Sequence, residues 1–379
     1  MVGALPMDLR SVKGGVEAAI LNLFSGFSHF PDVEVLHLSF VRTQSIPLEI
    51  HFAPNVRICF VPFKSRYRIV DYFANKSELN KIIKEETPDI IHIQESEPHL
   101  LRFLSLPKEK IVVTQHGIMR EELKYASGLK SKLKFLFKTI VERYVFPAFK
   151  NVIFISNYNR KLFKGTLQKE ASIYNAVNPI FFDHQPQVKP DRATSIYVGV
   201  ISRRKNLKIV IEALHLLRQK SIKFTLHVVG WYKEQDLDYE NEIVGLMKQY
   251  DLGDQVKFHG WLQQKDILKL YDECTTFILP SLQETLPVSI AEAMALGKTV
   301  IASDVGAISE MFENQVSGYL FPKNSLKHLM ELLESLYLGS QLTENQSHMI
   351  KAIATKKYHP LENANRTLAF YREVLSATK

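Results

Sequence analysis

The chain has 379 residues, of which 46% are hydrophobic and 23% are charged, a composition typical of soluble globular proteins and not of disordered or fibrous ones. This length is too great for one ordinary core and suits two domains. The two cysteines, Cys59 and Cys274, lie far apart, so they indicate neither a disulfide framework nor a zinc site and favour a reducing, intracellular setting. The sequence contains neither a recognisable export signal nor an apolar run long enough to span a membrane.

The formal net charge of +8 is unevenly distributed. Residues 1–200 hold 27 Lys and Arg against 19 Asp and Glu, whereas residues 201–379 hold 21 of each kind. Residues 101–150 alone hold 11 basic against 4 acidic residues. This pattern predicts a basic face on one domain and not a generally basic protein.

Apolar segments of strand length alternate with amphipathic segments of helix length along both halves. The expected strands cover residues 33–40, 56–61, 89–93, 110–114 and 152–155, then 194–198, 224–229, 256–259, 276–279 and 299–302. Runs of Val and Ile separated by helices are typical of parallel strands buried on both faces. A further strand before the first glycine pair would have only residues 1–5, which is short for a central strand and favours a sequence that begins a few residues late.

The polar, Pro-containing residues 178–194 interrupt this alternation and are the expected linker. The predicted fold class is α/β, with two Rossmann-like doubly wound domains that face each other across a cleft. The expected domains are residues 1–180 and 190–360. Residues 361–379 are expected to form a C-terminal helix that crosses back to the N-terminal domain.

In the first domain, two features follow expected strands, where open α/β sheets bind their ligands. Gly14 and Gly15 come just before a helix, so a phosphate could approach the backbone amides there, although a glycine pair is by itself more often a plain turn. The usual dinucleotide and P-loop glycine patterns are absent. His116 ends a buried strand and could bond a hydroxyl group or simply cap the strand.

In the second domain, Arg203, Arg204 and Lys205 stand directly before a helix that is expected to begin near Leu207. Three cations there oppose the helix dipole unless a negative group lies among them. A diphosphate would supply that group. The alternative is a solvated basic turn.

Glu284 and Glu292 occur in "PSLQETLPVSIAEAMALGKTVIAS", a segment that otherwise reads as a loop, a helix of small residues and a buried strand. Pro287 is expected at the first helical position, and Gly297 is expected to end the helix. Helical side chains tilt toward the N-terminus, so Glu292 should lean toward the end that Glu284 precedes. Because a buried carboxylate needs partners, we expect hydroxyl groups of a sugar or ribose beside both residues.

With these residues in place, the chain resembles the retaining, nucleotide-sugar-dependent glycosyltransferases of family 4, which have the two-domain GT-B fold. The resemblance rests on Glu284 and Glu292 with seven residues between them. It is supported by the segments "VKFHGWL", "NQVSGYLF", "YVGVISRRKN" and "KGGVE".

The resemblance implies a role for each matched residue. Glu284 would bind the donor sugar, Glu292 the ribose, Lys205 and the Gly15 amide the diphosphate, and His116 the transferred sugar. The backbone amides of Leu286 and Val288 would hold sugar and phosphate oxygens. The activity implied is metal-independent transfer of a hexosyl or N-acetylhexosaminyl group from a nucleoside-diphosphate sugar to a glycan or lipid-linked acceptor, in the synthesis of cell-envelope polysaccharide or glycolipid. No cofactor and no protein nucleophile are implied, because the leaving phosphate assists the acceptor.

One departure from the family pattern concerns charge. Val200 stands where the family usually has an arginine, so Arg203 or Arg204 must replace that cation. Without a replacement, the alternative is a non-catalytic nucleotide-sugar-binding protein on a degenerate transferase scaffold.

Two other readings are weaker. Asp236 and Asp238 formally match the Asp-x-Asp motif of metal-dependent glycosyltransferases, but their polar surroundings indicate a solvated helix start. Nucleic-acid binding is suggested only by the high isoelectric point, and no recognition motif accompanies it.

The basic face has two expected parts. One is the amphipathic segment 129–144, where Lys130, Lys134 and Lys138 lie beside an apolar stripe, and Phe135 projects away from that stripe toward a possible membrane. The other contains Lys64, Arg66 and Arg68 among aromatic residues. The functional hypothesis for both parts is peripheral binding to an anionic membrane surface on its cytoplasmic side. A core helix with a solvated lysine face is the alternative.

Overall fold

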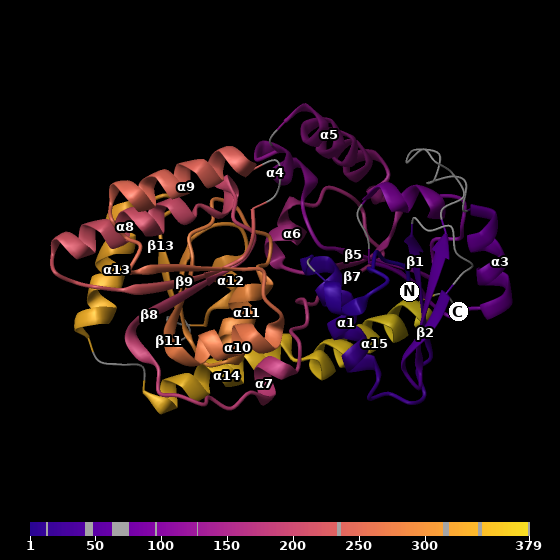
Figure 1. The fold of residues 1–379 in the computed structure, drawn as a ribbon. Coiled ribbons are helices and arrows are strands. Elements are labelled where there is room, and N and C mark those ends of the chain that lie inside the picture. The colour runs from indigo at the N-terminus through magenta and orange to yellow at the C-terminus, as the bar shows by residue number, and fades with distance from the viewer. Residues whose placement is uncertain are drawn as a thin grey trace. The chain divides into compact units, whose positions relative to one another are not determined.

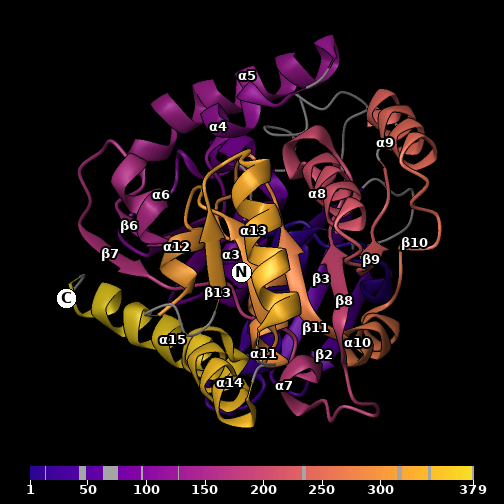
Figure 2. The same ribbon diagram turned by 90° about the vertical axis from the view of Figure 1, so that its left-hand side faces the viewer.

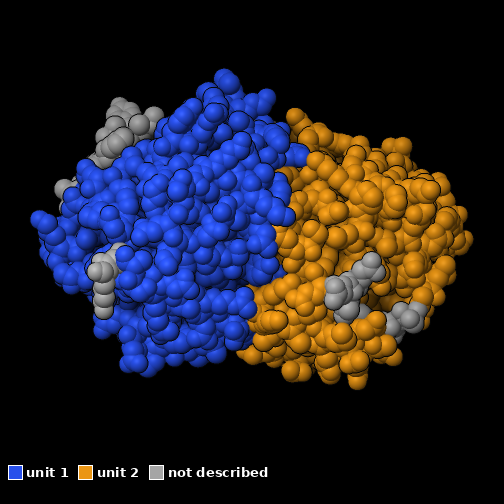
Figure 3. Space-filling view, turned by 180° about the vertical axis from the view of Figure 1, so that it is seen from behind, with its two compact units in different colours: residues 1–178, 358–379 blue, residues 179–357 orange. Residues whose placement is uncertain are grey.

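The chain divides into two compact units in the computed structural model, which describes residues 1–12, 14–41, 48–62, 76–94, 97–126, 128–232, 236–313, 318–339 and 343–377. Unit 1 consists of residues 1–178 and 358–379, and unit 2 of residues 179–357 (Figure 3).

Unit 1 is an α/β assembly (Figure 1). Its described elements are η1 (Leu9–Ser11), α1 (Gly15–Phe27), β1 (Val35–Val41), β2 (Leu48–Ala53), β3 (Val56–Pro62), α3 (Lys76–Glu86), β4 (Ile91–Ile93), η2 (Glu97–Phe103), β5 (Ile111–Gln115), α4 (Met119–Lys124), α5 (Leu129–Tyr144), η3 (Phe146–Ala148), β6 (Asn151–Phe154), α6 (Asn157–Leu162), β7 (Lys169–Ser172) and α15 (Pro360–Ser376).

The N-terminal segment joins two groups of strands in unit 1. Val2 forms parallel bridges to Leu38 of β1 on one side and to Ile93 of β4 on the other. It thereby links the order β2-β3-β1 to the order β4-β5-β6-β7. The strands are parallel except β2, which pairs antiparallel with β3. Strand β2 was not predicted, because its largely exposed side chains do not form a continuous apolar run.

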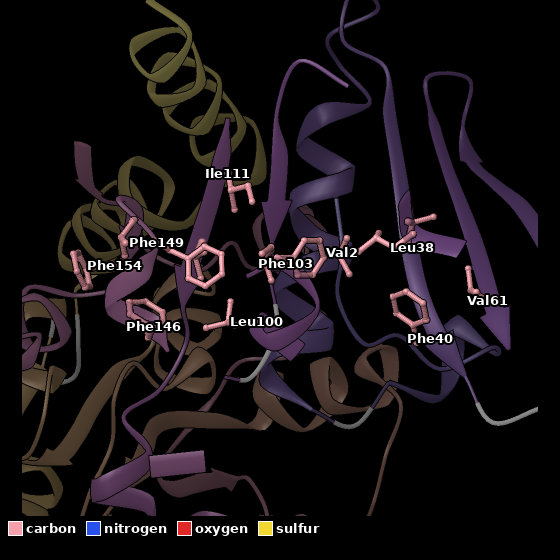
Figure 4. Packing of buried hydrophobic residues seen from close by; sticks show 14 residues of the cluster. Val2, Leu38, Phe40, Val61, Leu100, Phe103, Ile111, Phe146, Phe149 and Phe154 are labelled. Carbon is pink, nitrogen blue, oxygen red and sulfur yellow. The ribbon is translucent and has the colours of Figure 1, made fainter. Parts of the chain in front are cut away.

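Buried apolar side chains fill the spaces against this sheet. Figure 4 shows one cluster, in which Val2 and Leu38 from the sheet lie near Phe103 of η2, with Phe146 and Phe149 farther along. A second cluster lies under α1 and includes Ala364 and Leu368 of α15.

The C-terminal helix α15 belongs to unit 1 and packs against α1. The contact is close at Gly26, where an added Cβ would lie 2.2 Å from the carbonyl oxygen of Pro360. Glycine at this point lets α1 and α15 approach each other closely. Side chains of α15 therefore form part of the same hydrophobic core as those of α1.

Unit 2 contains one six-stranded parallel sheet. Its described elements are α7 (Ile180–Asp183), β8 (Asp191–Val198), η4 (Arg203–Lys205), α8 (Leu207–Gln219), β9 (Thr225–Val229), α9 (Leu237–Gln249), β10 (Val256–Gly260), α10 (Gln264–Glu273), β11 (Cys274–Leu279), α11 (Val288–Ala295), β12 (Thr299–Ser303), α12 (Ile308–Met311), β13 (Gly318–Phe321), α13 (Leu326–Leu338) and α14 (Glu344–Tyr358). Helices α8, α9 and α13 lie on one side of the sheet, and α10 and α11 lie on the other (Figures 1 and 2).

The strand order in unit 2 is β10-β9-β8-β11-β12-β13. The chain therefore winds outward in one direction from β8 and in the other from β11. Ligands of such sheets bind beyond the carboxyl ends of the two strands where the order reverses. The loops that leave this point are residues 199–206 after β8 and residues 280–287 after β11. The predicted fold class of two doubly wound α/β domains is confirmed. Each of the ten strands predicted from residue 33 onward has an observed counterpart, whereas the expected strand over residues 1–5 is reduced to the bridges of Val2, and β2, β7 and β13 were not predicted.

Candidate active site

The loop between β11 and α11 is held by its backbone. The Leu282 amide donates to the carbonyl oxygen of Arg204 at 2.7 Å, and the Ser303 hydroxyl donates to the carbonyl oxygen of Ser281. Gly306 has a φ of +59°, and a Cβ there would lie 1.6 Å from the carbonyl oxygen of Glu284. Only glycine fits this contact, so the segments after β8 and β12 together fix the position of Glu284.

Glu284 meets two of the three predicted cations. The Lys205 ammonium donates to Glu284 Oε1 at 2.6 Å, and Arg204 Nη1 lies 3.4 Å from the same oxygen. Arg204 Nη1 also donates to the carbonyl oxygen of Gln283 at 2.8 Å. Burial alone would raise the pKa of Glu284, but Lys205 and Arg204 outweigh it and hold this pKa below its ordinary value. The cluster thus carries two positive charges and one negative charge in a largely buried setting.

Arg203 points elsewhere. Its guanidinium pairs with Glu242 of α9 at 2.6 Å and lies over the Tyr239 ring, and its side chain is 61% exposed. Of the two arginines that the sequence left open, Arg204 is therefore the one beside Glu284. The Val200 side chain supplies no charge, and its carbonyl oxygen accepts a hydrogen bond from the Tyr197 hydroxyl at 3.0 Å.

The start of α11 differs by one residue from the prediction. Pro287 is the N-cap, with extended backbone, and Val288 is the first helical residue. The Ile290 amide donates to the Pro287 carbonyl oxygen at 3.1 Å, so proline shapes the turn from just outside the helix. Val288 lies in the first turn, where backbone amides have no acceptor within their own helix, and Leu286 is buried in the preceding loop. The helix ends as expected, with Gly297 at a φ of +70° after Leu296.

Glu292 is partly buried on α11, among Ala291, Ala293 and Met294, which are fully buried. Burial raises the pKa of Glu292 to about 7. A carboxyl group in this state binds hydroxyl donors more readily once it loses its proton, because the carboxylate is then an acceptor only. Lys205 and Arg204 keep Glu284 ionised, whereas the pKa of Glu292 is close to neutral pH. The two carboxyl groups are therefore in different electrostatic surroundings.

In unit 1, the loop predicted to bind phosphate, at Gly14 and Gly15, contacts the carboxylate of Glu17. Gly14 is the N-cap of α1, and its amide donates to Glu17 Oε2 at 3.2 Å. Gly15 is the first helical residue and is exposed, and an added Cβ there would meet no atom within 4 Å. Glu17 thus occupies the amide of Gly14, while the fold itself does not require a glycine at position 15.

His116 follows β5 and is fixed by a neighbour from the adjacent strand. Its Nε2 lies 2.6 Å from Gln94 Oε1, so the ring donates from this nitrogen, and Gln94 follows the end of β4. Burial lowers the pKa of His116 to about 4, and Asn175 offsets part of the shift. The imidazole is therefore neutral at physiological pH. The same region contains a small cavity lined by His116, Gln94, Thr114, Asn175 and residues of α1 and α15.

Two partners of the candidate residues, Glu17 and Gln94, were not predicted from the sequence. Each left a signal in the sequence. Glu17 stands three residues after the N-cap, which is the spacing of a reciprocal helix cap. Gln94 directly follows a buried strand, at the same sheet edge as His116.

Asp236 and Asp238 lie at the start of a helix and not at a strand end. Asp236 is the N-cap of α9, and Asp238 lies in its first turn and is exposed. Negative charge there complements the helix dipole. This is the arrangement expected of a solvated helix start.

The predicted basic face is described only in part. Lys64, Arg66 and Arg68 lie outside the described residues. On α5, Lys130 and Lys134 are exposed, whereas Lys138 is partly buried. The expectation for Phe135 was wrong: its side chain is partly buried, and the leucine stripe that it was thought to oppose is the exposed side.

Comparison with known proteins places these features in a family. The family model described as Glycosyltransferase Family 4 matches residues 13–180, and the model described as Glycosyl transferases group 1 matches residues 180–356. The chain is a family 4 glycosyltransferase. Two solved structures resemble this glycosyltransferase over 99% of both chains: sucrose-phosphate synthase from Thermosynechococcus elongatus, with a TM-score of 0.77 and 17% identity, and Anabaena HepE in complex with UDP and glucose, with a TM-score of 0.72 and 18% identity. Both have the GT-B fold.

Curated relatives match this glycosyltransferase over shorter stretches. The amylovoran biosynthesis glycosyltransferase AmsK of Erwinia amylovora is 38% identical over 82 residues, which is 20% of each chain. The N,N'-diacetylbacillosaminyl-diphospho-undecaprenol alpha-1,3-N-acetylgalactosaminyltransferase of Campylobacter jejuni is 32% identical over 114 residues, 30% of each chain. The match to these two relatives thus spans less than a third of their length. The uncharacterized glycosyltransferase MJ1178 of Methanocaldococcus jannaschii is 25% identical over 315 residues, 80% of this chain and 82% of the relative.

Proposed function

We propose that this glycosyltransferase moves a hexosyl or N-acetylhexosaminyl group from a nucleoside-diphosphate sugar to a glycan or lipid-linked acceptor, with retention of configuration and without a metal ion. The observation that carries the proposal is the buried contact of Lys205 and Arg204 with Glu284 beyond the carboxyl ends of β8 and β11. Two cations with one carboxylate suit a ligand that combines phosphate with sugar hydroxyl groups.

Each residue has a distinct part in donor binding. Lys205 and Arg204 neutralise the diphosphate, and Glu284 accepts hydrogen bonds from the hydroxyl groups of the donor sugar. Glu292 accepts from the ribose, and the amides of Leu286 and Val288 hold sugar and phosphate oxygens. In unit 1, the Gly15 amide meets the diphosphate and His116 contacts the transferred sugar. The Gly14 amide joins Gly15 if Glu17 gives up its bond.

Catalysis in this proposal is mainly electrostatic. The bond between the anomeric carbon and the phosphate oxygen breaks, which leaves positive charge on the sugar and negative charge on the departing phosphate. Lys205, Arg204 and the first amides of α11 stabilise that negative charge as it develops. The acceptor hydroxyl attacks the same face of the sugar, and its proton passes to the leaving phosphate. No side chain forms a covalent bond with the sugar.

The proposed acceptor draws on the names of two relatives. AmsK is named for amylovoran biosynthesis, and the Campylobacter relative is named for transfer to a diphospho-undecaprenol-linked sugar. These names support a role in cell-envelope polysaccharide or glycolipid synthesis. The place of action in this proposal is the cytoplasmic face of a membrane. Within the described chain, no helix is both long enough and apolar enough to cross a bilayer.

The test measures donor binding and donor turnover separately. Glu284→Gln keeps the size of the side chain but removes the charge between Lys205 and Arg204, so we expect turnover of a labelled UDP-, GDP- or ADP-sugar to fall at least ~100-fold. Glu242→Gln, which removes the partner of Arg203, is the matched control and should retain most of the activity. Binding of a nucleotide sugar with no turnover by the unaltered protein, with or without added divalent metal, would favour the non-catalytic alternative. Activity abolished by a chelator and restored by metal would contradict metal independence.

A further inference from the structure

Helix α5 presents an apolar stripe to the outside of unit 1. The stripe consists of long apolar side chains at three- and four-residue intervals, which places them on one face of the helix. Their exposed fractions range from 36% to 74%, in Leu129, Leu133, Leu136, Phe137, Ile140 and Tyr144. Soluble proteins rarely expose so continuous an apolar surface without a partner for it.

The rotation of α5 is fixed by polar contacts on its inner side. The Glu142 carboxylate accepts hydrogen bonds from the Met119 amide at 3.1 Å and from Gln115 Nε2 at 3.2 Å. Val141 is buried on the same side, and the helix packs against α4, η2 and η3. Glu142 is the single acidic residue of α5, so the outward side of this helix carries no negative charge.

Cations border the apolar stripe on both sides. Lys130 lies on one edge, three residues before Leu133. On the other edge, Lys132 stands four residues before Leu136, and Arg143 stands three residues after Ile140. All three basic side chains are exposed. Long basic side chains at such positions can extend toward phosphate groups while the stripe enters an apolar layer.

We propose that α5 lies flat on an anionic bilayer, with the stripe from Leu129 to Tyr144 in the boundary between head groups and acyl chains and with Lys130, Lys132 and Arg143 at the lipid phosphates. Anionic lipid is favoured over a second copy of this chain. A symmetric contact between two copies would place the same cationic edges against each other, which opposes association. The inference adds a defined contact surface to the proposed function and rests on it only for the identity of the acceptor.

The experiment measures binding of the full chain to vesicles of phosphatidylcholine with and without phosphatidylglycerol, at low and high salt. We expect binding to the anionic vesicles at low salt only. The triple variant Leu133→Ser, Leu136→Ser and Ile140→Ser should bind roughly tenfold more weakly or worse, because it removes apolar surface that enters the bilayer. Lys130→Gln with Lys132→Gln should weaken binding to anionic vesicles and leave any binding to neutral vesicles unchanged.

Matched controls distinguish binding through α5 from non-specific adsorption and from loss of folding. Leu237→Ser with Val244→Ser removes two exposed apolar side chains from α9 in unit 2 and should leave vesicle binding unchanged. A fluorescent probe attached at Leu136→Cys should shift to the blue on anionic vesicles. Equal binding by the triple variant and the parent protein would overturn the proposal, as would a parent dimer that the triple variant converts to a monomer. Turnover of a nucleotide sugar with a water-soluble acceptor, measured in parallel, tests the proposed function independently, because the serine positions lie outside the candidate active site.

Discussion

Lys205 Nζ and Glu284 Oε1 lie 2.6 Å apart. These are the two side chains proposed to bind the diphosphate and the sugar of the donor. The two side chains satisfy each other in the structure, and a donor bound as proposed would divide them between its phosphate and its hydroxyl groups. The contact keeps a buried carboxylate ionised and in position before the donor arrives.

Lys205→Met should destabilise the free protein. It leaves Glu284 buried with only Arg204 as a cationic partner, so we expect a loss of about 1–3 kcal/mol in the free energy of unfolding. Unfolding in urea, monitored by circular dichroism, measures the loss. Lys205→Met combined with Glu284→Gln should recover part of it, because no unpaired charge remains. A double variant less stable than either single variant would contradict the pairing.

The two arginines should differ in their effect on turnover. Arg204→Gln removes the cation beside Glu284, so we expect kcat/KM for the donor to fall about 100-fold or more. Arg203→Gln removes only the exposed contacts with Glu242 and the Tyr239 ring and should change kcat/KM by less than about threefold. Steady-state kinetics with a labelled donor compares the two variants. The opposite ranking would show that Arg203 turns toward the donor when it binds.

Nucleotide affinity should increase with pH through the pKa of Glu292, which is about 7. Ribose hydroxyl groups donate to the ionised carboxylate, so binding favours the deprotonated form and releases protons near neutrality. Calorimetric titrations with a nucleoside diphosphate between pH 6 and 8, about one unit on each side of this pKa, should show tighter binding at the higher pH. Glu292→Gln should bind weakly and without this pH dependence. An identical pH dependence in the variant would assign the proton to another group.

The raised pKa of Glu292 also predicts an effect of pH on the stability of the protein. The pKa of Glu292 is higher in the folded than in the unfolded protein. The stability that its protonated form contributes to the folded state is therefore fully present at low pH and is lost as the pH rises through about 7. Glu292→Gln should therefore stabilise the free protein above pH 7, by about 1–2 kcal/mol given that the side chain is partly exposed. Thermal unfolding at several pH values measures the difference. A variant that is less stable than the parent at high pH would contradict the shift.

Gly15→Ala separates donor binding from folding. A methyl group at position 15 enters open space at the first helical position, so stability should be unchanged or higher by up to about 1 kcal/mol. If a phosphate approaches the Gly15 amide, the same methyl group should weaken donor binding several-fold, as measured by thermal shift with a nucleotide sugar. Gly26→Ala is the contrasting variant and should destabilise the protein, because its methyl group would overlap the carbonyl of Pro360. Unchanged donor affinity in Gly15→Ala would remove this loop from the proposed site.

The local pattern of apolar and polar residues in the sequence was sufficient to predict most of the fold and the principal candidate site residues. Continuous apolar runs located ten strands, because parallel strands buried on both faces need them. The strands β2, β7 and β13 were missed because none of them is buried along its whole length. Glu284 and Glu292 were recognisable as candidates because carboxylates are unusual in a loop and helix otherwise built for the core.

Tertiary structure alone decided how these candidates are partnered. Three consecutive cations look alike in a sequence. In the fold, the bond between the Leu282 amide and the Arg204 carbonyl joins the two loops, so Arg204 lies beside Glu284 while Arg203 pairs with Glu242. The periodicity of α5 likewise defines an apolar stripe without indicating which way it faces. That direction is set by Glu142 and its contacts with the start of α4, since the side of a helix that becomes buried depends on what the rest of the chain places beside it.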